Sequence, residues 1–335
     1  MLTVLRYPKS SQFTSGCRLA TGRSCIAHLI DIYQPKIVFM SCYVPEGVIW
    51  PFAKAGVEIK FYRLNRDLSP NVDDVQRLIS VARAPFIFVF IHYFGWPGLI
   101  DMLLTEAVRD QGGVILEDCA HRLFDESTSE ADVTLYSLNK FLPVADGAIM
   151  VSRNSAIDIT VGDGLRPLSD VTLFAYAAHL EANARIANGF AIGQAMQDNR
   201  RAYEIYYDGI KDMKPHGQSN QSRAVEAATN YLGMMTGRKR KSLLLAGLLS
   251  RLAVRPHVAS QFAFPIRCHG HRREMETALF SADVMASTLT DRWDHVRHDF
   301  AIETEFFDDH LLLPIGEDVT NADCYRMAEV LKQFT

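Results

Sequence analysis

The sequence predicts an α/β protein with a mostly parallel central sheet covered by helices on both faces, followed by a smaller α+β domain at the C-terminal end. Between residues 21 and 152, short apolar runs alternate with amphipathic segments. Several runs, such as "PFIFVFI", are apolar throughout, as expected of strands buried on both faces. The polar stretch "KPHGQSNQS" then separates this pattern from a different one. We therefore expect a large domain at 1–213 and a small domain at 214–335.

The elements of the large domain follow from hydrophobic periodicity. Apolar side chains at helical spacing predict a helix at 22–33, which Thr21 is suited to cap. The same criterion predicts helices at 72–82 and 99–110, and an alanine-rich helical region at 170–213. Apolar runs of strand length predict strands at 36–42, 57–64, 85–95, 112–120, 133–138 and 147–152.

The C-terminal part has its own pattern of strands and helices. Strands are predicted at 261–269 and 311–316, and helices at 272–285 and 320–334. Thr320 and Asp323 form a capping-box-like start of the last helix.

Composition excludes several classes of protein. The 335 residues are 48% apolar and 22% charged, as in a globular protein, and no apolar run approaches the roughly 20 residues of a membrane helix. The net charge of −4 gives no general attraction to nucleic acid or to an anionic membrane. The one dense basic run, "RKRK" at 238–241, is predicted to lie on a solvated helix face.

Cysteine usage and the N-terminal segment indicate a cytoplasmic protein. The six cysteines are scattered without a CxxC pair, which disfavours a zinc ribbon or a disulfide framework and fits a reducing compartment. The segment "MLTVLRYPKSSQFTS" lacks the apolar core of a signal peptide.

Residues that could carry chemistry follow the predicted strands at their carboxyl ends. In an open parallel sheet these ends lie along one edge, where ligands bind. The helix that begins at Gly22 would present its N-terminus beside this edge, and helix N-termini bind phosphate through free N–H groups and the helix dipole. The strand-end residues are Tyr43, His92, Asp118, His121, Ser137, Asn139 and Lys140.

A phosphate cradle, a carboxylate, an aromatic ring and a strand-end lysine together indicate pyridoxal 5′-phosphate (PLP). Lys140 would form the Schiff base, and Asp118 would pair with the pyridinium nitrogen, whose charge should keep the carboxylate ionised. Tyr43 would stack on the ring and His121 would hydrogen-bond the ring hydroxyl. The phosphate would be held by Gly22, Arg23, Ser24 and Ser137.

Each of these residues also has a simpler interpretation. Lys140 alone could be a solvated loop residue, and Asp118 alone a helix cap or turn former. His121 could be an ordinary polar residue, and Tyr43 a packing residue. The joint order, spacing and strand-end placement favour the PLP interpretation.

Two segments resemble the core of the DegT/DnrJ/StrS aminotransferases, which are fold type I PLP enzymes of the aspartate aminotransferase superfamily. They are "IHYFGWPGLIDMLLTEAVRDQGGVILEDCAHRLFD" and "ADVTLYSLNKFLPVADGAIMVS", with "EDCAH", "SLNK" and "DGA" as the most specific motifs. The resemblance covers most of the chain, more loosely from 158 to 260. It implies that Asp118 pairs with the pyridinium, that His121 takes the position three residues on, and that Lys140 bonds covalently to PLP.

The resemblance also implies an activity and an assembly. The chain would transfer an amino group from an amino acid donor to a keto acceptor, which in many of these enzymes is a nucleotide-linked keto sugar. It would form a homodimer with the active site at the subunit interface, consistent with closed twofold assembly as the commonest oligomer.

The sequence departs from the family pattern at three places. Ser137 lies three residues before the lysine, where the family commonly has five, and the glycine pair after the lysine is Gly147-Ala148 here. The usual Gly-Tyr-Asn-type segment is not evident. Two alternatives therefore stay open: a non-transaminating PLP-fold protein with a regulatory or scaffold role, and a PLP-dependent lyase or dehydratase.

Two further classes are disfavoured. No GxGxxG motif follows the first strand, which disfavours an NAD-binding Rossmann enzyme. The pairs "HGH" (His269, His271) and "HVRH" (His295, His298) lack carboxylate or cysteine partners in the sequence, so we expect no metal site.

Overall fold

The structure is a computed structural model that describes residues 16–83, 85–97, 102–123, 130–162, 164–188, 190–289 and 299–335. The signal-peptide prediction for the first 15 residues, the start of the predicted helix at 99–110 and the pair His295 and His298 lie outside the described residues.

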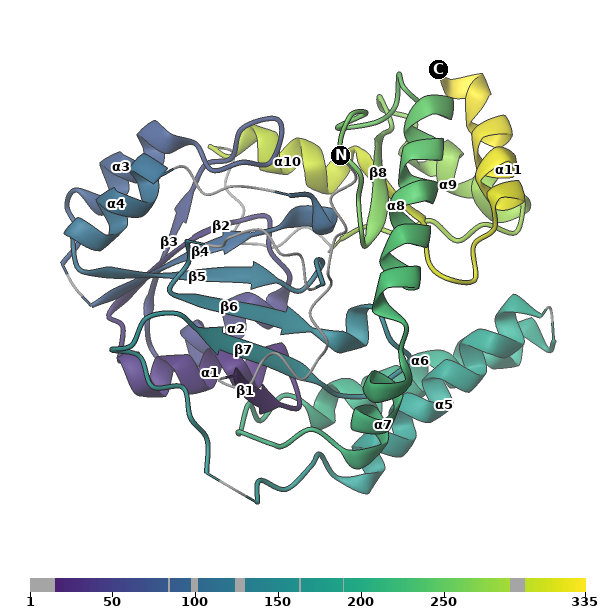
Figure 1. The fold of residues 1–335 in the computed structure, drawn as a ribbon. Coiled ribbons are helices and arrows are strands. Elements are labelled where there is room, and N and C mark those ends of the chain that lie inside the picture. Colours follow the sequence, from purple (N-terminus) through teal and green to yellow (C-terminus); the bar gives the residue numbers. More distant parts are fainter. Residues whose placement is uncertain are drawn as a thin grey trace, which may run out of the picture.

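The described residues form a seven-stranded central sheet (Figure 1). All neighbouring strands pair in parallel except β7, which is antiparallel to both of its neighbours. The prediction of a mostly parallel sheet is confirmed. In spatial order the strands are β1 (Gly16–Leu19), β7 (Ala148–Ser152), β6 (Val133–Ser137), β5 (Gly113–Cys119), β4 (Phe86–Ile91), β2 (Ile37–Ser41) and β3 (Glu58–Tyr62).

Helices cover both faces of this sheet because alternate strand residues point to opposite sides. On one face, α1 (Gly22–Tyr33) and α2 (Glu46–Lys54) share a core with Leu116 and Leu135. On the other face, α3 (Val72–Ile79) and α4 (Met102–Asp110) pack against Ile115. The sequence analysis did not identify β1 or α2. The latter contains Pro51, which disrupts the periodic pattern of a helix.

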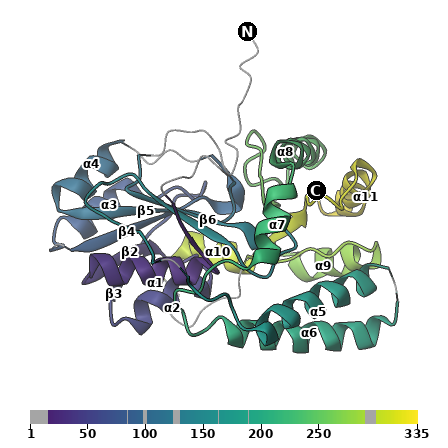
Figure 2. The ribbon, with the colours of Figure 1, turned by 60° about the horizontal axis from the view of Figure 1, so that its bottom comes forward.

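The predicted helical region at 170–213 is a hairpin of two long helices, α5 (Asp170–Ala187) and α6 (Ile192–Gly209). The two helices pack side by side and project away from the sheet (Figures 1 and 2). An ion pair between Arg185 and Asp198, with a nitrogen–oxygen distance of 2.5 Å, joins them near the hairpin end. The base of α6 returns toward α1 and α2, as described below.

The C-terminal part has a core of its own. Its two strands, β8 (Ala263–Arg267) and β9 (His310–Pro314), pair antiparallel. They share a hydrophobic core with α8 (Tyr231–Leu248), α9 (Arg272–Ser281) and α11 (Asn321–Leu331), which lie to the right of the sheet in Figure 1. The predicted capping box of Thr320 and Asp323 is present at the start of α11.

The remaining helices connect the two parts. α7 (Asn220–Ala228) precedes α8, and α10 (Ala301–Asp308) buries Phe306 and Phe307 in the core beneath the large sheet. Three short 3₁₀ segments are η2 (Tyr93–Gly95), η3 (Leu138–Lys140) and η4 (Lys332–Phe334). The division at residue 213 stays a prediction, because α10 belongs to the C-terminal part yet packs on the large sheet.

The prediction that "RKRK" lies on a solvated helix face is wrong for two of its residues. Arg238 and Lys241 are buried, because their side chains turn toward the core side of α8. Arg238 forms a two-point ion pair with Glu317 at 2.7 Å, and the Lys241 amine donates to the backbone carbonyls of Gly316 and Val319.

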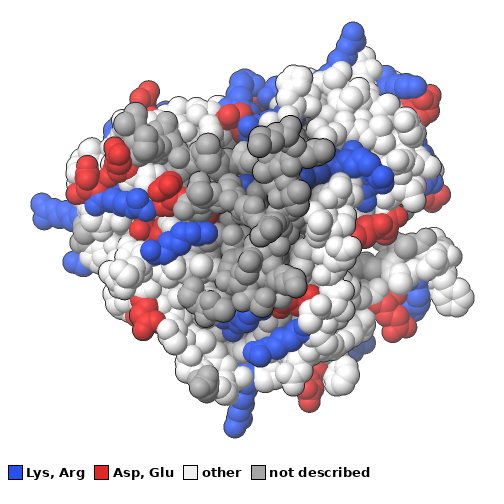
Figure 3. All heavy atoms as spheres, viewed as in Figure 1, with Lys and Arg blue, Asp and Glu red and all other residues white. Residues whose placement is uncertain are grey.

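Elsewhere the charges are mixed. On the face of the molecule in Figure 3, basic and acidic side chains are interspersed among neutral ones. Among the helices of the described residues, none combines the length and the apolar character needed to cross a membrane.

Candidate active site

Two strand-end side chains lie on the same face of the sheet as α1. Asp118 lies two residues beyond Leu116 on β5, and Ser137 lies two residues beyond Leu135 on β6. Both leucines belong to the core beneath α1, and residues two apart on a strand face the same side. A Cβ added to Gly22 would lie 3.6 Å from Leu135 Cδ2, so this face meets the N-terminal end of α1.

Lys140 ends the 3₁₀ turn that follows β6. The turn is fixed because the Leu138 N–H donates to the Gly147 carbonyl at 2.8 Å and the Phe141 N–H to the Leu138 carbonyl at 2.9 Å. Gly147 has a φ of +122°, in the region that favours glycine, and its N–H reaches the Ala20 carbonyl at 2.7 Å. Through these hydrogen bonds, Gly147 of the sequence "DGA" ties the turn that carries Lys140 to the backbone before α1.

The amine of Lys140 lies in a concave, desolvated environment. Its side chain is accessible to solvent, yet enough protein surrounds it that desolvation lowers its pKa from 10.5, and the positive charge of Arg23 lowers it further. The carboxylate of Asp118 opposes this effect and raises the pKa. The geometry agrees with these effects: β5, which carries Asp118, pairs with β6, which leads to Lys140, and Gly22, next to Arg23, lies against Leu135 of β6.

Asp118 is buried, and its carboxylate orientation is fixed. The Ala120 N–H donates to Asp118 Oδ1 at 2.8 Å. Burial raises the pKa of this carboxyl, although the Ala120 hydrogen bond and the positive charge of Lys140 act to lower it. The expectation that a pyridinium charge keeps Asp118 ionised stays a prediction.

The N-terminus of α1 carries hydrogen-bond donors and a cation. Thr21 caps the helix by accepting the Ser24 N–H at 3.1 Å, and the two hydroxyls lie 2.9 Å apart. The N–H groups of Gly22 and Arg23 belong to the first turn, whose N–H groups have no partner within the helix. Nη1 of Arg23 is buried and has no hydrogen-bond partner among the described residues. Free donors and a cation at a helix N-terminus attract anions.

His121 is enclosed by aromatic rings. Its imidazole stacks on Phe262, with ring centroids 4.0 Å apart and an angle of 3° between the planes. Burial, together with the positive charge of Lys140, lowers the pKa of His121 to about 3. The ring is therefore neutral near pH 7, and its buried Nδ1 has no hydrogen-bond partner among the described residues.

The stacking role predicted for Tyr43 is not supported. Only 2% of this residue is exposed, because its ring lies in the core among Tyr93, Phe306 and Phe307. The ring centroids of Tyr43 and Phe307 are 4.9 Å apart, in an edge-to-face contact. A ring surrounded in this way offers no open face to a ligand.

Ser137 and Asn139 connect the site to α6, which the sequence analysis did not connect with the site. The Ser137 hydroxyl donates to Asn139 Oδ1 at 2.9 Å, and Asn139 Nδ2 donates to the Tyr206 hydroxyl at 3.3 Å. The Tyr206 hydroxyl in turn donates to the Ala145 carbonyl at 2.7 Å. The aromatic stretch "YEIYY" is a sequence signal for this contact, but it does not identify the partners.

His92 points away from Lys140 into the opposite side of the sheet, where it supports the backbone. Its Nε2 lies 2.7 Å from Glu117 Oε1, and its Nδ1 lies 3.1 Å from the Trp96 carbonyl oxygen. The ligand atoms of His92, Glu117 and Cys119 lie within 4.8 Å of one another. Burial raises the pKa of the Cys119 thiol well above its usual value, which disfavours the thiolate needed for metal binding.

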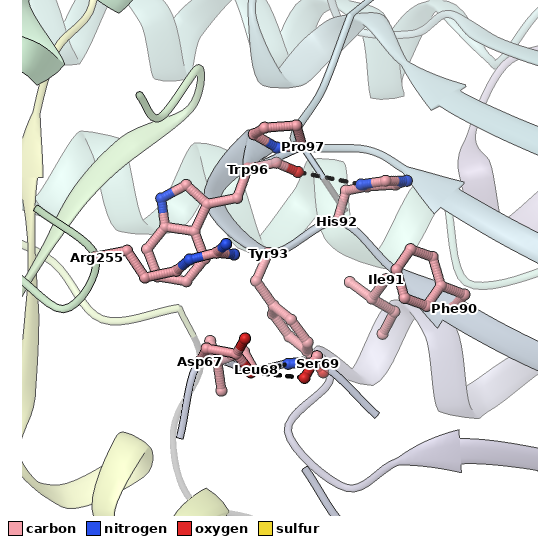
Figure 4. A pocket seen from close by; sticks show the side chains of 10 residues that line it. All are labelled: Asp67, Leu68, Ser69, Phe90, Ile91, His92, Tyr93, Trp96, Pro97 and Arg255. Carbon is pink, nitrogen blue, oxygen red and sulfur yellow. Dashed lines mark hydrogen bonds between the residues drawn. The ribbon is translucent and has the colours of Figure 1, made fainter. Parts of the chain in front are cut away.

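A cavity of about 170 Å³ opens at the carboxyl end of β4 (Figure 4). Arg255 lies over the Trp96 ring, 5.0 Å from its centroid, and Asp67 faces the cavity from the loop after β3. Of the strand-end residues named above, His92 is the one that lines it. This cavity is therefore separate from the group formed by Lys140 and Asp118.

The fold of this chain, with its seven-stranded sheet and antiparallel β7, is similar to that of solved aminotransferase structures. No family model matches the chain, and no curated protein matches it in sequence. The similar solved structures include a DegT DnrJ EryC1 StrS aminotransferase from Brucella abortus, with a TM-score of 0.64 and 14% identity, covering 98% of this chain and 91% of that chain.

Three of these structures illustrate the similarity. The sugar aminotransferase CalS13 from Micromonospora echinospora has a TM-score of 0.68 and 15% identity, covering 95% of this chain and 87% of that chain. The putative sugar aminotransferase Spr1654 from Streptococcus pneumoniae, in its PLP form, has a TM-score of 0.68 and 13% identity, covering 98% and 92%. PseC from Helicobacter pylori, an aminotransferase of pseudoaminic acid biosynthesis, has a TM-score of 0.66 and 11% identity, covering 95% and 86%. At these identities the similarity shows the fold.

Proposed function

We propose that this chain is a PLP-dependent aminotransferase that moves an amino group from an amino acid donor to a keto acceptor. The observation that carries the proposal is the placement of Asp118 and Lys140 at the carboxyl ends of the paired strands β5 and β6, next to the N-terminus of α1. The fold is the one that CalS13 and Spr1654 share, and the latter is described in PLP and PMP forms.

The residues present fit PLP. The buried, unpartnered Nη1 of Arg23 and the N-terminus of α1 suit a phosphate. The unpartnered Nδ1 of His121 suits a polar group on the cofactor ring. Asp118 would pair with the ring nitrogen and Lys140 would bond covalently. Gly22, Arg23, Ser24 and Ser137 would hold the phosphate. When bound, PLP supplies an electron sink that stabilises a carbanion at the donor's α-carbon.

Lys140, Asp118 and His121 would each have a separate role in this reaction. Because its pKa is lowered, Lys140 provides a neutral amine at lower pH than an ordinary lysine, so Nζ can attack a carbonyl and can accept or donate a proton. The Ala120 N–H orients the Asp118 carboxylate toward the site. The stacked ring of Phe262 holds the His121 imidazole in place, and burial together with the charge of Lys140 keeps it neutral.

We further infer that the keto acceptor is a sugar linked to a nucleotide. This is supported by the structural similarity to DesI, which is described in the presence of its TDP-sugar product, with a TM-score of 0.66 and 15% identity, covering 95% of this chain and 80% of that chain.

We also propose a homodimer. The α5–α6 hairpin exposes large apolar side chains, including Val171 at 68%, Phe174 at 73% and Phe190 at 66%. Exposed apolar surface of this kind is typical of interfaces. Light scattering should give twice the mass of the chain, and the mass of one chain would contradict the proposal.

The test of the activity begins with the covalent bond. Protein incubated with PLP and reduced with borohydride should carry a stable adduct on Lys140 in peptide maps. The variant Lys140→Ala should carry none and should not turn over, whereas Lys54→Ala, which removes an exposed lysine at the end of α2, should behave as the wild type. An adduct on another lysine, or full turnover by Lys140→Ala, would overturn the proposal.

A second measurement separates transamination from the alternatives. Amino acid donors should convert the bound cofactor to pyridoxamine phosphate, which is detected by its absorbance and by mass spectrometry. Loss of water or of a side-chain fragment from the substrate, without this conversion, would identify a lyase or dehydratase. An adduct that responds to no donor would favour a regulatory or scaffold role.

A further inference from the structure

The second half of α6 contacts the N-terminal ends of α1 and α2. The Tyr207 hydroxyl donates to Glu46 Oε2 at 2.5 Å, and the guanidinium carbon of Arg23 lies 4.5 Å from the centroid of the Tyr207 ring. Burial, together with the Glu46 acceptor, raises the pKa of Tyr207 to about 12. The hydroxyl therefore stays protonated and keeps donating to Glu46 near pH 7.

The position of Arg23 is restricted from a second side. A Cβ added to Gly47, in the first turn of α2, would lie 3.0 Å from Arg23 Nε. Because Gly47 has no side chain, the guanidinium of Arg23 can occupy this space. Arg23 is held between the backbone of α2 and the ring of Tyr207.

This arrangement holds a cation without neutralising it. Among the described residues, no ion pair of Arg23 is found, and its guanidinium lies over the neutral ring of Tyr207. Nη1 of Arg23 is buried and, within the described residues, unpartnered. A half-buried guanidinium with a free, buried donor is suited to a phosphate group.

We infer that Tyr207 and Glu46 are positioning residues of the phosphate subsite: Glu46 fixes the hydroxyl of Tyr207, and the ring of Tyr207 holds the Arg23 guanidinium at the N-terminus of α1. This inference rests on the proposed function, because it takes the phosphate to be that of PLP. A cation that is already in place loses little freedom when the anion binds, which strengthens binding.

The test compares PLP with pyridoxal, which has the same ring and aldehyde but no phosphate. Dissociation constants of both are measured by absorbance titration of the wild type and its variants. Replacing the ring by Tyr207→Leu should reduce the preference for PLP over pyridoxal roughly three- to thirtyfold, the range of a cation–π contact. Tyr207→Phe keeps the ring and should restore most of the preference. A general loss of structure would weaken both ligands and leave their ratio unchanged.

One variant serves as a matched control and another as a second test. Tyr325→Leu removes an exposed tyrosine on α11, and it should leave the preference for PLP as in the wild type. Glu46→Ala frees the Tyr207 hydroxyl with little change in packing and should lower the preference roughly two- to fivefold, so the inference stays testable if Tyr207→Leu does not fold.

The outcomes separate this inference from the proposed function. If the wild type forms the Lys140 adduct but Tyr207→Leu and Glu46→Ala prefer PLP as strongly as the wild type, the positioning role is refuted and the aminotransferase proposal stands. If the wild type forms no adduct with PLP or with pyridoxal, the proposed function and this inference both fail.

Discussion

The imidazole of His121 is buried in a neutral form, so acidification is expected to destabilise the fold through this one side chain. Its pKa in the folded chain is about 3, because burial and the charge of Lys140 disfavour the protonated ring. In the unfolded chain a histidine has a pKa of about 6.5. Between these values the unfolded state binds a proton that the folded state does not, so the free energy of unfolding falls as the pH falls.

The magnitude follows from the difference in bound protons. A difference of one bound proton between the unfolded and folded states changes the free energy of unfolding by about 1.4 kcal/mol per pH unit, or about 2 kcal/mol between pH 6.5 and pH 5. Urea unfolding of the cofactor-free protein across this range should show that His121→Gln, which cannot take up the proton, loses about 2 kcal/mol less stability than the wild type.

A second buried histidine tests the same argument at another position. Burial lowers the pKa of His310, on β9, to about 4, so His310→Gln should reduce the pH dependence by a similar amount. The two sites lie in different parts of the fold and should act additively in the double variant. Identical pH dependence in the wild type and in His121→Gln would refute the burial argument for His121.

Three further expectations concern charges. Asp118 raises the pKa of the Lys140 amine, so in Asp118→Asn the pH midpoint for forming the borohydride-trapped PLP adduct should move to lower pH; a move to higher pH would contradict the assignment. Arg23 lowers the pKa of Lys140, so Arg23→Gln should move the pH midpoint to higher pH. If the midpoint moved in the same direction in Asp118→Asn and in Arg23→Gln, the two side chains would not act on Lys140 in opposite ways. Arg238→Met removes an ion pair and two hydrogen bonds to backbone carbonyls, and urea unfolding should show a loss of about 2–4 kcal/mol. The exposed Arg240→Met on the same helix should change stability by no more than about 0.5 kcal/mol, and equal effects of the two would refute the role of Arg238.

Several elements could be predicted because their signals are local. Apolar runs of strand length identified the strands around Asp118 and Lys140, and a 3.6-residue pattern identified the helix that begins at Gly22, since each pattern reflects which side chains of one segment face the core. The antiparallel direction of β7 was not predicted, because strand direction depends on a connection through space rather than on the composition of the strand.

The errors have a common physical origin. Tyr43 follows a strand as predicted, but α10, distant in the sequence, places Phe306 and Phe307 around its ring. Arg238 lies in a run of four basic residues, yet its guanidinium finds Glu317 and is buried. In both cases the partner that decides burial is remote along the chain.

The sequence by itself determined the alternating architecture, the strand-end positions of Asp118 and Lys140, and the helix start at Gly22, because neighbouring residues set the periodicity, the turn after β6 and the cap of α1. Only the tertiary structure decided which side chains meet there. Arg23 faces the ring of Tyr207 and His121 stacks on Phe262 because α6 and the segment before β8 fold back onto the edge of the sheet. Contacts between distant segments depend on the packing of the whole chain, which no local pattern encodes.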